Sequence, residues 1–234
     1  MGRPAHGPVT GLSAGCSSLV RVRPLIESGH YLGKVHNRGR CAIELLRGDE
    51  VVGAALFGQP ARETVAVSLW KCDDDEDRKS AVAATLELTR FYTIDGLHPN
   101  AGTWFLSRAV RMLPSGTEML IAFSDEDAGH HGGLYQAASW LYTGTSASDH
   151  YHYVDGQGGR VAKQTPWRYA QRQRLADPSI TERPADGERR IAAERGWTKV
   201  KDKPKHRYVL PLTRKARASL KLKVLEYPKP SRAG

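Results

Sequence analysis

Met119-Leu-Ile-Ala-Phe-Ser-Asp125, followed by Gly132-Gly-Leu-Tyr-Gln-Ala-Ala-Ser-Trp-Leu-Tyr-Thr-Gly144, is the part of the sequence that decides the fold class. Residues 119–123 form a short, wholly apolar run, which is typical of a strand buried on both faces of a parallel sheet. Such a strand delivers Ser124 and Asp125 to its carboxyl end, where sites in α/β proteins form. A short helix and another strand follow within the second segment.

The rest of the chain alternates strand and helix patterns around this stretch. Two β-rich runs, 41–46 and 51–57, flank a Gly48-Asp49 turn and predict a hairpin. The run 87–93 predicts a strand whose alternation places Leu88, Arg90 and Tyr92 on one face. We further expect helices over 24–35, 78–86, 100–113 (capped by Asn100), 134–140, 166–175 and 187–195, strands over 63–71, 141–144 and 207–212, and a second hairpin over 151–162. Together they predict an α/β (α+β) fold with a mixed central sheet flanked by helices.

The composition is that of one large globular domain with extensions. The chain has 234 residues, 40% apolar and 26% charged, so it can bury a sizeable core. Three scattered cysteines argue against a disulfide scaffold and a thiolate zinc site. No apolar run approaches the ~18 residues that cross a bilayer, and the N-terminus lacks an apolar signal segment, so we expect a cytoplasmic protein with no membrane partner.

We expect a flexible segment over 1–20, a core domain over 21–212 and a basic tail over 213–234.

The positive charge is concentrated near the C-terminus. The net charge is +10, and residues 199–234 hold twelve Lys or Arg and two acids, so the remainder is neutral. Such a segment binds polyphosphate by counterion release, although a solvated, solubilising tail has the same composition. The interleaved aromatic and apolar residues favour an extended contact with double-stranded DNA. The expected DNA contacts are Lys203, Lys205, Arg207, Tyr208, Arg214 and Lys215.

An opposite cluster of charge lies mid-chain. Asp73-Asp-Asp-Glu-Asp77 is a run of five acids that directly follows Trp70-Lys-Cys72. Carboxylates bind hard cations, but five in a row repel one another and discourage regular structure. We therefore expect a solvated loop there.

The order of hairpin, strand, helix, buried strand, short helix and strand resembles the GNAT acyltransferase fold. In many members a tyrosine on the last core helix protonates the leaving thiolate of coenzyme A, and the resemblance assigns this place to Tyr135. GNAT enzymes commonly carry a Gln/Arg-x-x-Gly-x-Gly/Ala loop that binds the cofactor pyrophosphate at a helix N-terminus. The corresponding stretch here, Leu97-His-Pro-Asn-Ala-Gly-Thr103, has one glycine. The donor is therefore left open between acetyl-CoA, another acyl-CoA and an unknown small molecule.

Four short pieces in order resemble the phage Mom-like DNA-modification family, a divergent GNAT branch, over about residues 28–212. Members convert adenine in phage DNA to an N6-carbamoylmethyl derivative, which shields the DNA from host restriction. The resemblance implies a transferase that acts on the N6 amine of adenine in DNA. The pieces are Glu87-Leu-Thr-Arg-Phe-Tyr92, Asn100-Ala-Gly-Thr-Trp-Phe-Leu-Ser-Arg108, Ala122-Phe-Ser-Asp125 with Gly129-His-His-Gly-Gly-Leu-Tyr-Gln-Ala137, and Lys205-His-Arg-Tyr208.

The chemistry that the N6 amine of adenine requires indicates which residues are candidates for catalysis. The amine is a poor nucleophile, so an enzyme must expose the base, align it with an electrophile and remove a proton. Asp125 is the candidate base; a carboxylate at this position otherwise caps a helix or belongs to a loop. Ser124 orients the base or the donor, or is a turn hydroxyl. Tyr135 is a general acid, a stacking residue or a core tyrosine.

The candidate donor-binding residues are cationic or lie at the start of the 100–113 helix. Arg90 and Arg108 suit a phosphate or carboxylate of the donor, and a buried ion pair is the alternative for Arg90. Asn100 and Gly102 lie where the pyrophosphate loop of GNAT enzymes precedes its helix. His30-Tyr31 is a weaker candidate, because a satisfied or exposed histidine explains it equally well.

The histidines also allow a metal site to be considered. Imidazole and carboxylate ligands are available from His130, His131, His150 and His152 with Asp125 or Asp127. Neither histidine pair has the i, i+4 spacing of a zinc-binding helix, and adjacent histidines usually point apart. We expect no metal.

Two other classes of protein fit the same sequence. An ordinary GNAT N-acetyltransferase would use acetyl-CoA on a small amine or peptide and would not depend on the basic segment. A non-enzymatic DNA-binding protein would need only that segment, but no recognition helix or zinc-finger pattern supplies sequence readout.

Overall fold

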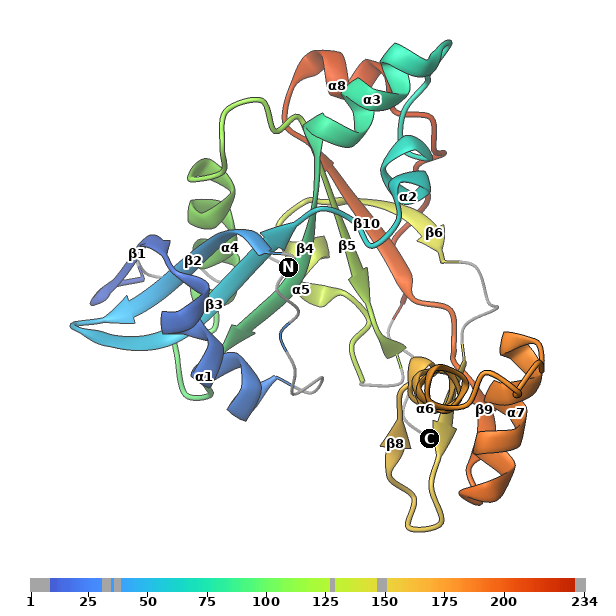
Figure 1. Cartoon of the computed structure of the whole chain (residues 1–234). Helices are drawn as coiled ribbons and strands as arrows, with labels where there is room; N and C mark the ends of the chain where they lie inside the picture. The colour runs from blue at the N-terminus through green and yellow to red at the C-terminus, as the bar shows by residue number, and fades with distance from the viewer. Residues whose placement is uncertain (1–8, 31–34, 36–38, 127–128, 147–150, 230–234) are drawn as a thin grey trace. The chain divides into compact units, whose positions relative to one another are not determined.

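The computed structural model describes residues 9–30, 35, 39–126, 129–146 and 151–229 and divides the chain into two compact units (Figure 1). The first unit comprises Met1–Thr145 and Lys205–Gly234, and the second comprises Ser146–Pro204. The interval 21–212, expected to form one domain, thus contains a second compact unit, inserted between two strands of the first.

A mixed sheet forms the first unit. Its seven strands are β1 (Leu12–Ser17), β2 (Gly39–Arg47), β3 (Glu50–Gly58), β4 (Thr85–Thr93), β5 (Met119–Ser124), β6 (Leu141–Thr145) and β10 (His206–Pro211). They lie in the order β1-β2-β3-β4-β5-β10-β6. All neighbours are antiparallel except β4 and β5, which are parallel. The expected hairpin is confirmed as β2–β3, with Gly48 at a φ of +60° in its turn, a conformation that favours glycine.

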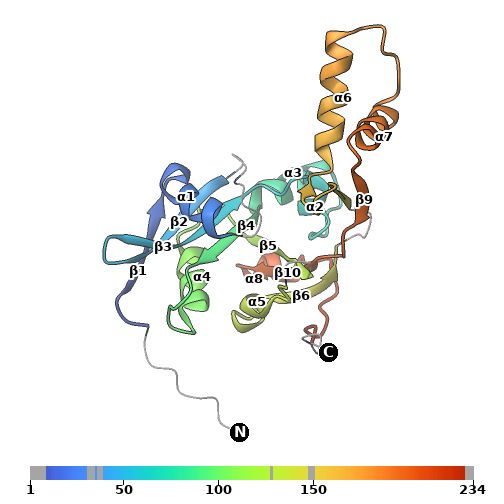
Figure 2. The same cartoon turned by 90° about the horizontal axis from the view of Figure 1, so that it is seen from below.

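Helices cover both faces of this sheet. Helix α4 (Ala101–Arg111) and the short α5 (Gly133–Ala137) lie on one face, and α1 (Leu19–Gly29) lies on the other (Figure 2). The largest core, under α4, contains Phe57, Phe105, Trp140 and Tyr208. A second core lies under α1, and a third is closed by α2 (Glu63–Val67), α3 (Asp75–Ala84) and α8 (Arg214–Ala218).

The second unit has its own small sheet and two helices. Strands β7 (Tyr151–Val154), β8 (Arg160–Val161) and β9 (Thr198–Lys201) lie in the order β8-β7-β9, and all pairs are antiparallel. Helices α6 (Gln164–Ala176) and α7 (Pro184–Glu194) lie side by side (Figure 1). A Cβ added at Gly187 would lie 2.9 Å from the Cβ of Ala170, so this glycine lets the two helices pack closely.

Two expectations for the segment 63–77 are wrong. Residues 63–71 were expected to form a strand from their β-branched side chains, but they contain helix α2, whose Ala66 is buried in the fold with Leu69 nearby. The acidic run was expected to be a loop, but helix α3 begins within it. Asp74 is the N-cap and accepts a hydrogen bond from the amide of Asp77 at 2.8 Å. Acidic side chains are stabilising at a helix N-terminus, which offsets their mutual repulsion.

The N-terminal region also differs from expectation. Residues 12–17, expected to be flexible, form β1 on the edge of the sheet next to β2. Helix α1 begins at Leu19 rather than at Pro24, because Ser18 caps it by accepting a hydrogen bond from the amide of Arg21. Pro24 therefore lies inside the helix. Pro24 was expected to open the helix because proline favours its first turn.

A β-bulge changes which side chains of β4 share a face. Leu56 lies opposite Arg90 and Phe57 lies opposite Leu88, so Thr89 is an extra residue on β4. Leu88 packs in the core under α4, whereas Arg90 and Tyr92 point to the α1 face, where the ring of Tyr92 contacts Gly29. The expectation that Leu88 shares a face with Arg90 and Tyr92 is therefore wrong, because strict alternation fails at a bulge.

The C-terminal segment 213–229 packs on the first unit instead of extending into solvent. After α8, Leu220 forms an isolated β-bridge with Trp70. The amide of Leu225 donates to the carbonyl of Tyr142 at 2.9 Å, and the Tyr227 hydroxyl donates to the carbonyl of Trp140 at 2.9 Å. Composition indicated a tail because lysines dominate it, but its apolar residues attach it to the sheet.

Candidate active site

A cavity opens where the two parallel strands of the first unit separate. Strands β4 and β5 pair only over Thr85–Glu87 and Met119–Ile121, after which β4 follows β3 and β5 follows β10. The cavity, of about 560 Å³, lies beyond this point. Its walls are the end of α1, the outer part of β4, the end of β5 and the segment 129–135. The β4 edge there is not paired with β5, so its backbone groups are placed to bind a ligand that carries amide groups.

Ser124 forms a hydrogen bond to the chain that follows β5. Its hydroxyl donates to the carbonyl of His130 at 2.8 Å, and the amide of His130 donates to the carbonyl of Asp125 at 3.0 Å. Ser124 is buried and lines the cavity. These bonds match the turn-hydroxyl interpretation of Ser124 and hold Asp125 at the cavity wall.

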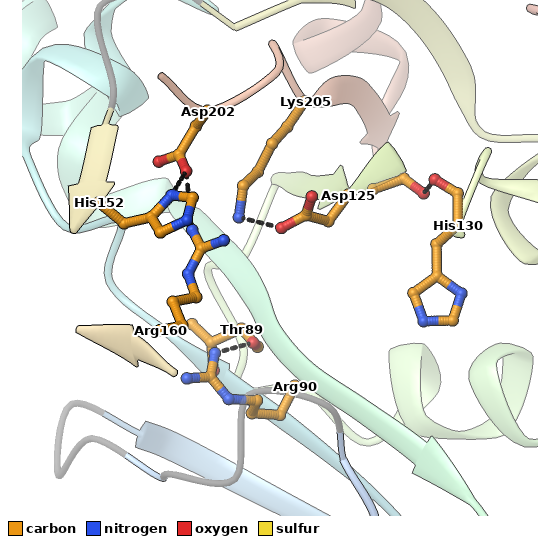
Figure 3. Close-up of polar contacts among 9 residues, drawn as sticks. Thr89, Arg90, Asp125, His130, His152, Arg160, Asp202 and Lys205 are labelled. Atoms are coloured by element: carbon orange, nitrogen blue, oxygen red, sulfur yellow. Dashed lines mark hydrogen bonds and ion pairs between the residues drawn. The ribbon is translucent and has the colours of Figure 1, made fainter. Parts of the chain in front are cut away.

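Asp125 forms an ion pair with Lys205, the residue that precedes β10. Its side chain is buried, at 7% exposed, and its Oδ2 lies 2.7 Å from the Nζ of Lys205, whose side chain is 34% exposed (Figure 3). A buried carboxylate needs such a partner, because an unpaired charge costs several kcal/mol to bury. Lys205 was expected to contact DNA; in the structure its ammonium group pairs with the carboxylate of Asp125.

The sequence did not indicate a second acid–base pair next to this one. The Nε2 of His206 lies 2.5 Å from Glu126 Oε1, and its Nδ1 lies 3.0 Å from the hydroxyl of Tyr142. His206 is buried, and burial together with Glu126 raises the pKa of Tyr142. The antiparallel register of β5 and β10, which places His206 opposite Ser124, brings the two pairs together. Only this long-range pairing could have revealed them.

Tyr135 lies on α5 at the cavity and is held by other aromatic rings. Its ring stacks on Tyr208 with a centroid distance of 5.1 Å and lies 5.3 Å from that of Trp140. Tyr208 in turn donates from its hydroxyl to the carbonyl of His131 at 2.9 Å and accepts from the side chain of Gln136. Tyr135 is partly exposed, so it remains accessible for stacking or proton transfer.

The α1 side of the cavity carries positive charge. Arg90 lines the cavity and donates from Nη1 to the carbonyl of Thr89 at 2.5 Å (Figure 3). His30, at the C-terminus of α1, also lines it, as does His130. Burial, Arg90 and His130 lower the pKa of His30 to about 4. His30 is therefore neutral at pH 7, and the surrounding field favours an anionic group of a ligand.

The other candidate donor residues do not line this cavity. Arg108 lies on the exposed side of α4, with its guanidinium 5.4 Å from the ring of Trp104. Asn100 occupies the N-cap position of α4, as expected, but its side chain makes no capping hydrogen bond. A Cβ added at Gly102 would lie 3.3 Å from Leu134, so this glycine lets α4 approach α5. Of the four, the structure brings only Arg90 to the cavity wall.

The expected DNA contacts fall in three different environments. Tyr208 is fully buried, so its assignment to DNA contact is wrong. Arg207 is partly buried: its side chain donates to the hydroxyl and carbonyl oxygens of Thr143, and burial lowers its pKa. Arg214 and Lys215 are exposed on α8, and Lys203 is exposed in the second unit.

Three residues considered for metal or donor binding lie outside the described ranges. Asp127, His150 and Tyr31 lie outside them. Within the described ranges, no three His, Cys, Asp or Glu side chains gather as metal ligands would. Of the helices in these ranges, none is long and apolar enough to span a membrane. In the second unit, His152 and Arg160 both contact Asp202, at 2.6 and 2.8 Å (Figure 3).

The first unit has a mixed central sheet flanked by helices, as the sequence predicted, and its two parallel strands diverge. Several solved structures are similar. An IAA acetyltransferase from Bacillus cereus has a TM-score of 0.46 at 10% identity, covering 86% of this chain and 99% of that chain. The GNAT-like decarboxylase GphF in complex with isobutyryl-CoA has a TM-score of 0.45 at 11% identity, covering 86% and 100%. An acetyltransferase from Elizabethkingia anophelis with acetyl-CoA bound has a TM-score of 0.40 at 10% identity, covering 87% and 99%.

A family model identifies the family of this chain. The model of the Mom protein family matches residues 20–229, which is most of the chain, and the protein belongs to this family. No curated protein matches in sequence. Membership supports a role in the modification of phage DNA.

Proposed function

We propose that this protein modifies the N6 amine of adenine in double-stranded DNA, adding a carbamoylmethyl group that protects phage DNA from restriction in the host cytoplasm. The observation that carries the proposal is the cavity between β4 and β5, which brings Asp125, Tyr135 and Arg90 together in a member of the Mom family. A cavity of about 560 Å³ is large enough for a nucleobase together with part of a small donor.

The cavity residues divide into two roles. The adenine, extruded from the duplex, stacks on Tyr135 and directs its amine toward Asp125, and base extrusion costs a few kcal/mol that stacking offsets. Asp125 accepts the amine proton as the new N–C bond forms and the bond from the transferred carbon to the donor's leaving group breaks. The leaving group departs with that electron pair and takes a proton from the hydroxyl of Tyr135, while Lys205 holds the carboxylate of Asp125 in place. Proton removal of this kind typically accelerates a reaction by about 10²–10⁴-fold.

Arg90 and the α1 end of the cavity are proposed to hold the donor. Burial, with Arg90 nearby, lowers the pKa of His30, and the guanidinium of Arg90 suits a carboxylate or phosphate. The unpaired edge of β4 suits a donor with amide groups, and an acyl-CoA is one such molecule. Arg108 lies outside the cavity wall, so we assign the anionic group to Arg90 alone.

Nucleoside mass spectrometry tests the proposal. Plasmid DNA from bacteria that express the protein should contain a heavier deoxyadenosine, whose added mass identifies the group. Asp125→Asn and Tyr135→Phe should each abolish this species while the proteins remain folded, and Ser107→Ala on α4 is a control. Unmodified DNA from cells supplied with candidate donors, together with acetyl transfer to small amines, would instead indicate an ordinary N-acetyltransferase.

A further inference from the structure

The second unit carries a basic face with exposed aromatic rings. We define this basic face by six cationic side chains on α6, the end of α7 and β9, all exposed: Lys163, Arg168, Arg172, Arg195, Lys199 and Lys201. Among the residues that the structure describes, none of the six lies within ion-pair distance of an acid.

The acids of this unit are engaged elsewhere. Asp186 pairs with Arg183 and Arg189, and Arg190 pairs with both Glu182 and Glu194. Asp202 pairs with Arg160 and His152, and Glu188 accepts hydrogen bonds from the hydroxyls of Tyr151 and Tyr153 at 2.6 and 3.0 Å. These acids are therefore paired away from the six cations of the basic face.

Cation–π contacts join the parts of the face. The ring of Tyr151 has the Nζ of Lys163 at 4.1 Å and the Nζ of Lys199 at 3.7 Å from its centroid. Further along α6, at Tyr169, the guanidinium of Arg195 lies 4.8 Å from the ring of Tyr169 and 6.0 Å from the ring of Trp197. The two groups of contacts, one around Tyr151 and one around Arg195, both connect the first half of α6 to residues 195–199. They therefore join these segments into one surface.

The outward stripe of α6 extends this surface. Arg168 and Arg172 are one helical turn apart and lie opposite the buried Pro166 and Ala170. Trp167 is 43% exposed and Tyr169 38% exposed, values that are high for large aromatic side chains in a helix that packs on a neighbour. From Lys163 to Arg172 the helix spans about 13 Å, which is the length of several phosphate charges on duplex DNA.

We propose that this basic face of the second unit binds the phosphate backbone of duplex DNA without sequence preference, holding the duplex that the first unit modifies. The inference rests on the proposed function for the choice of DNA as partner. Arginines and lysines contact phosphates, and the exposed rings of Trp167 and Tyr169 pack on sugars or unstacked bases. The proposed surface shares Lys199 and Lys201 with the basic segment 199–234 that composition indicated, and its other four cations lie outside that segment.

The test is fluorescence anisotropy of labelled duplex DNA with the full-length protein, without donor, over a salt series of about 50–200 mM. Arg168→Ala with Arg172→Ala should weaken binding about tenfold or more near 0.1 M salt and reduce the salt slope by about 2, since each lost phosphate contact removes about 0.9. Arg40→Ala with Arg111→Ala is the control, because it removes two exposed cations of the first unit and should leave affinity and slope within twofold of the original.

A second variant separates stacking from charge. Trp167→Ala should weaken binding several-fold while leaving the salt slope unchanged, because an apolar contact releases no counterions. Equal unfolding midpoints for all variants would show that the fold is intact.

The proposal is overturned if the Arg168/Arg172 variant binds DNA no more weakly than the control, or if Arg214→Ala with Lys215→Ala causes the loss instead. It is also overturned if the face binds anionic lipid vesicles but not DNA. Nucleoside analysis distinguishes this proposal from the proposed function. Unmodified adenine, together with DNA binding that depends on the basic face, would contradict the proposed reaction and leave the assignment of the DNA-binding surface in place.

Discussion

At the scale of single residues, buried charge decides the character of the site. Asp125 is buried at the cavity wall and paired with Lys205, and the adjacent Glu126 is paired with His206. Two carboxylates at the end of one strand thus face two bases at the start of another. Because a buried charge is stable only when paired, the pair of Asp125 and Lys205 contributes to both stability and chemistry, whereas Glu126 is 44% exposed.

Replacing Lys205 should destabilise the protein. Lys205→Met removes the cation from the buried carboxylate of Asp125, and we expect a loss of about 2–3 kcal/mol in the free energy of unfolding, below the usual range for buried pairs because Lys205 is partly exposed. Urea unfolding measures it. Adding Asp125→Asn to Lys205→Met should recover part of the loss, and additive effects of the two substitutions would contradict the pairing.

The low pKa of His30 should make stability depend on pH. Its pKa is about 4 in the folded protein and 6.5 in the unfolded chain, so between these values the unfolded chain binds more protons. The contribution of neutral His30 is fully present above pH 6.5 and is lost as the pH falls to 4, by at most about 3 kcal/mol.

The comparison of His30→Gln with the original protein isolates this effect. The difference in unfolding free energy between pH 7 and pH 4 should be smaller for the variant, while other groups titrate equally in both. Identical pH profiles would show that His30 is not held neutral. Binding of an anionic donor should raise the His30 pKa in an NMR titration.

At the scale of elements, the segment between β5 and α5 is positioned by one glycine. Gly132 has a φ of +85°, and a Cβ added there would lie 2.3 Å from the ring of Tyr208. The close approach lets Tyr135 stack on the buried Tyr208 at the cavity. Side-chain packing across β10 therefore sets the position of α5.

Gly132→Ala should disrupt this segment. Both the left-handed conformation and the ring contact oppose a methyl group, so we expect a loss of more than about 2 kcal/mol and loss of DNA modification. Gly133→Ala is the matched control: its added Cβ would meet only the end of the His131 side chain, at 3.2 Å. Thermal unfolding of the two variants should differ by several degrees, and equal midpoints would refute this role of Gly132.

At the scale of the whole molecule, the second unit is an insertion in a hairpin. Thr145 on β6 and His206 on β10 are register partners on adjacent antiparallel strands, so residues 146–204 leave and re-enter the sheet at neighbouring points. An insertion with adjacent ends can be removed with little strain on the surrounding sheet.

Replacing residues 146–204 by a short Asn-Gly-containing turn should leave the first unit folded. The seven-stranded sheet and its three cores lie in the first unit, and a tight turn suits antiparallel neighbours. Circular dichroism and cooperative thermal unfolding would check folding, and we expect the shortened protein to lose most of its affinity for DNA. A failure to fold would show that the second unit is required for the core.

Much of the fold was predictable because local patterns agreed with their tertiary context. The apolar run 119–123, the hairpin around Gly48 and the helix after Asn100 are all confirmed. The helix over residues 63–67 was not predictable, since the β-branched side chains of the run 63–71 favour a strand and only packing makes its first part helical. The second unit was not separated either, because its helices and strands have the same local patterns as the rest.

The site was predictable only in part. Asp125, Tyr135 and Arg90 follow from the residues and motifs around them, and all three line the cavity. The partners Lys205 and His206 lie about 80 positions further along the chain, and Tyr208 was assigned to DNA because a basic segment does not show which of its side chains face inward.

The sequence alone predicted the mixed sheet, the family resemblance and the place of Asp125 at the end of β5, because these depend on local periodicity and short motifs. Tertiary structure alone decided the bulge at Thr89, the pairing of Asp125 with Lys205, the buried position of Tyr208 and the engagement of the C-terminal segment. The physical reason is that strand register and packing between distant segments determine which charges are buried and paired, and neither is encoded in any local stretch.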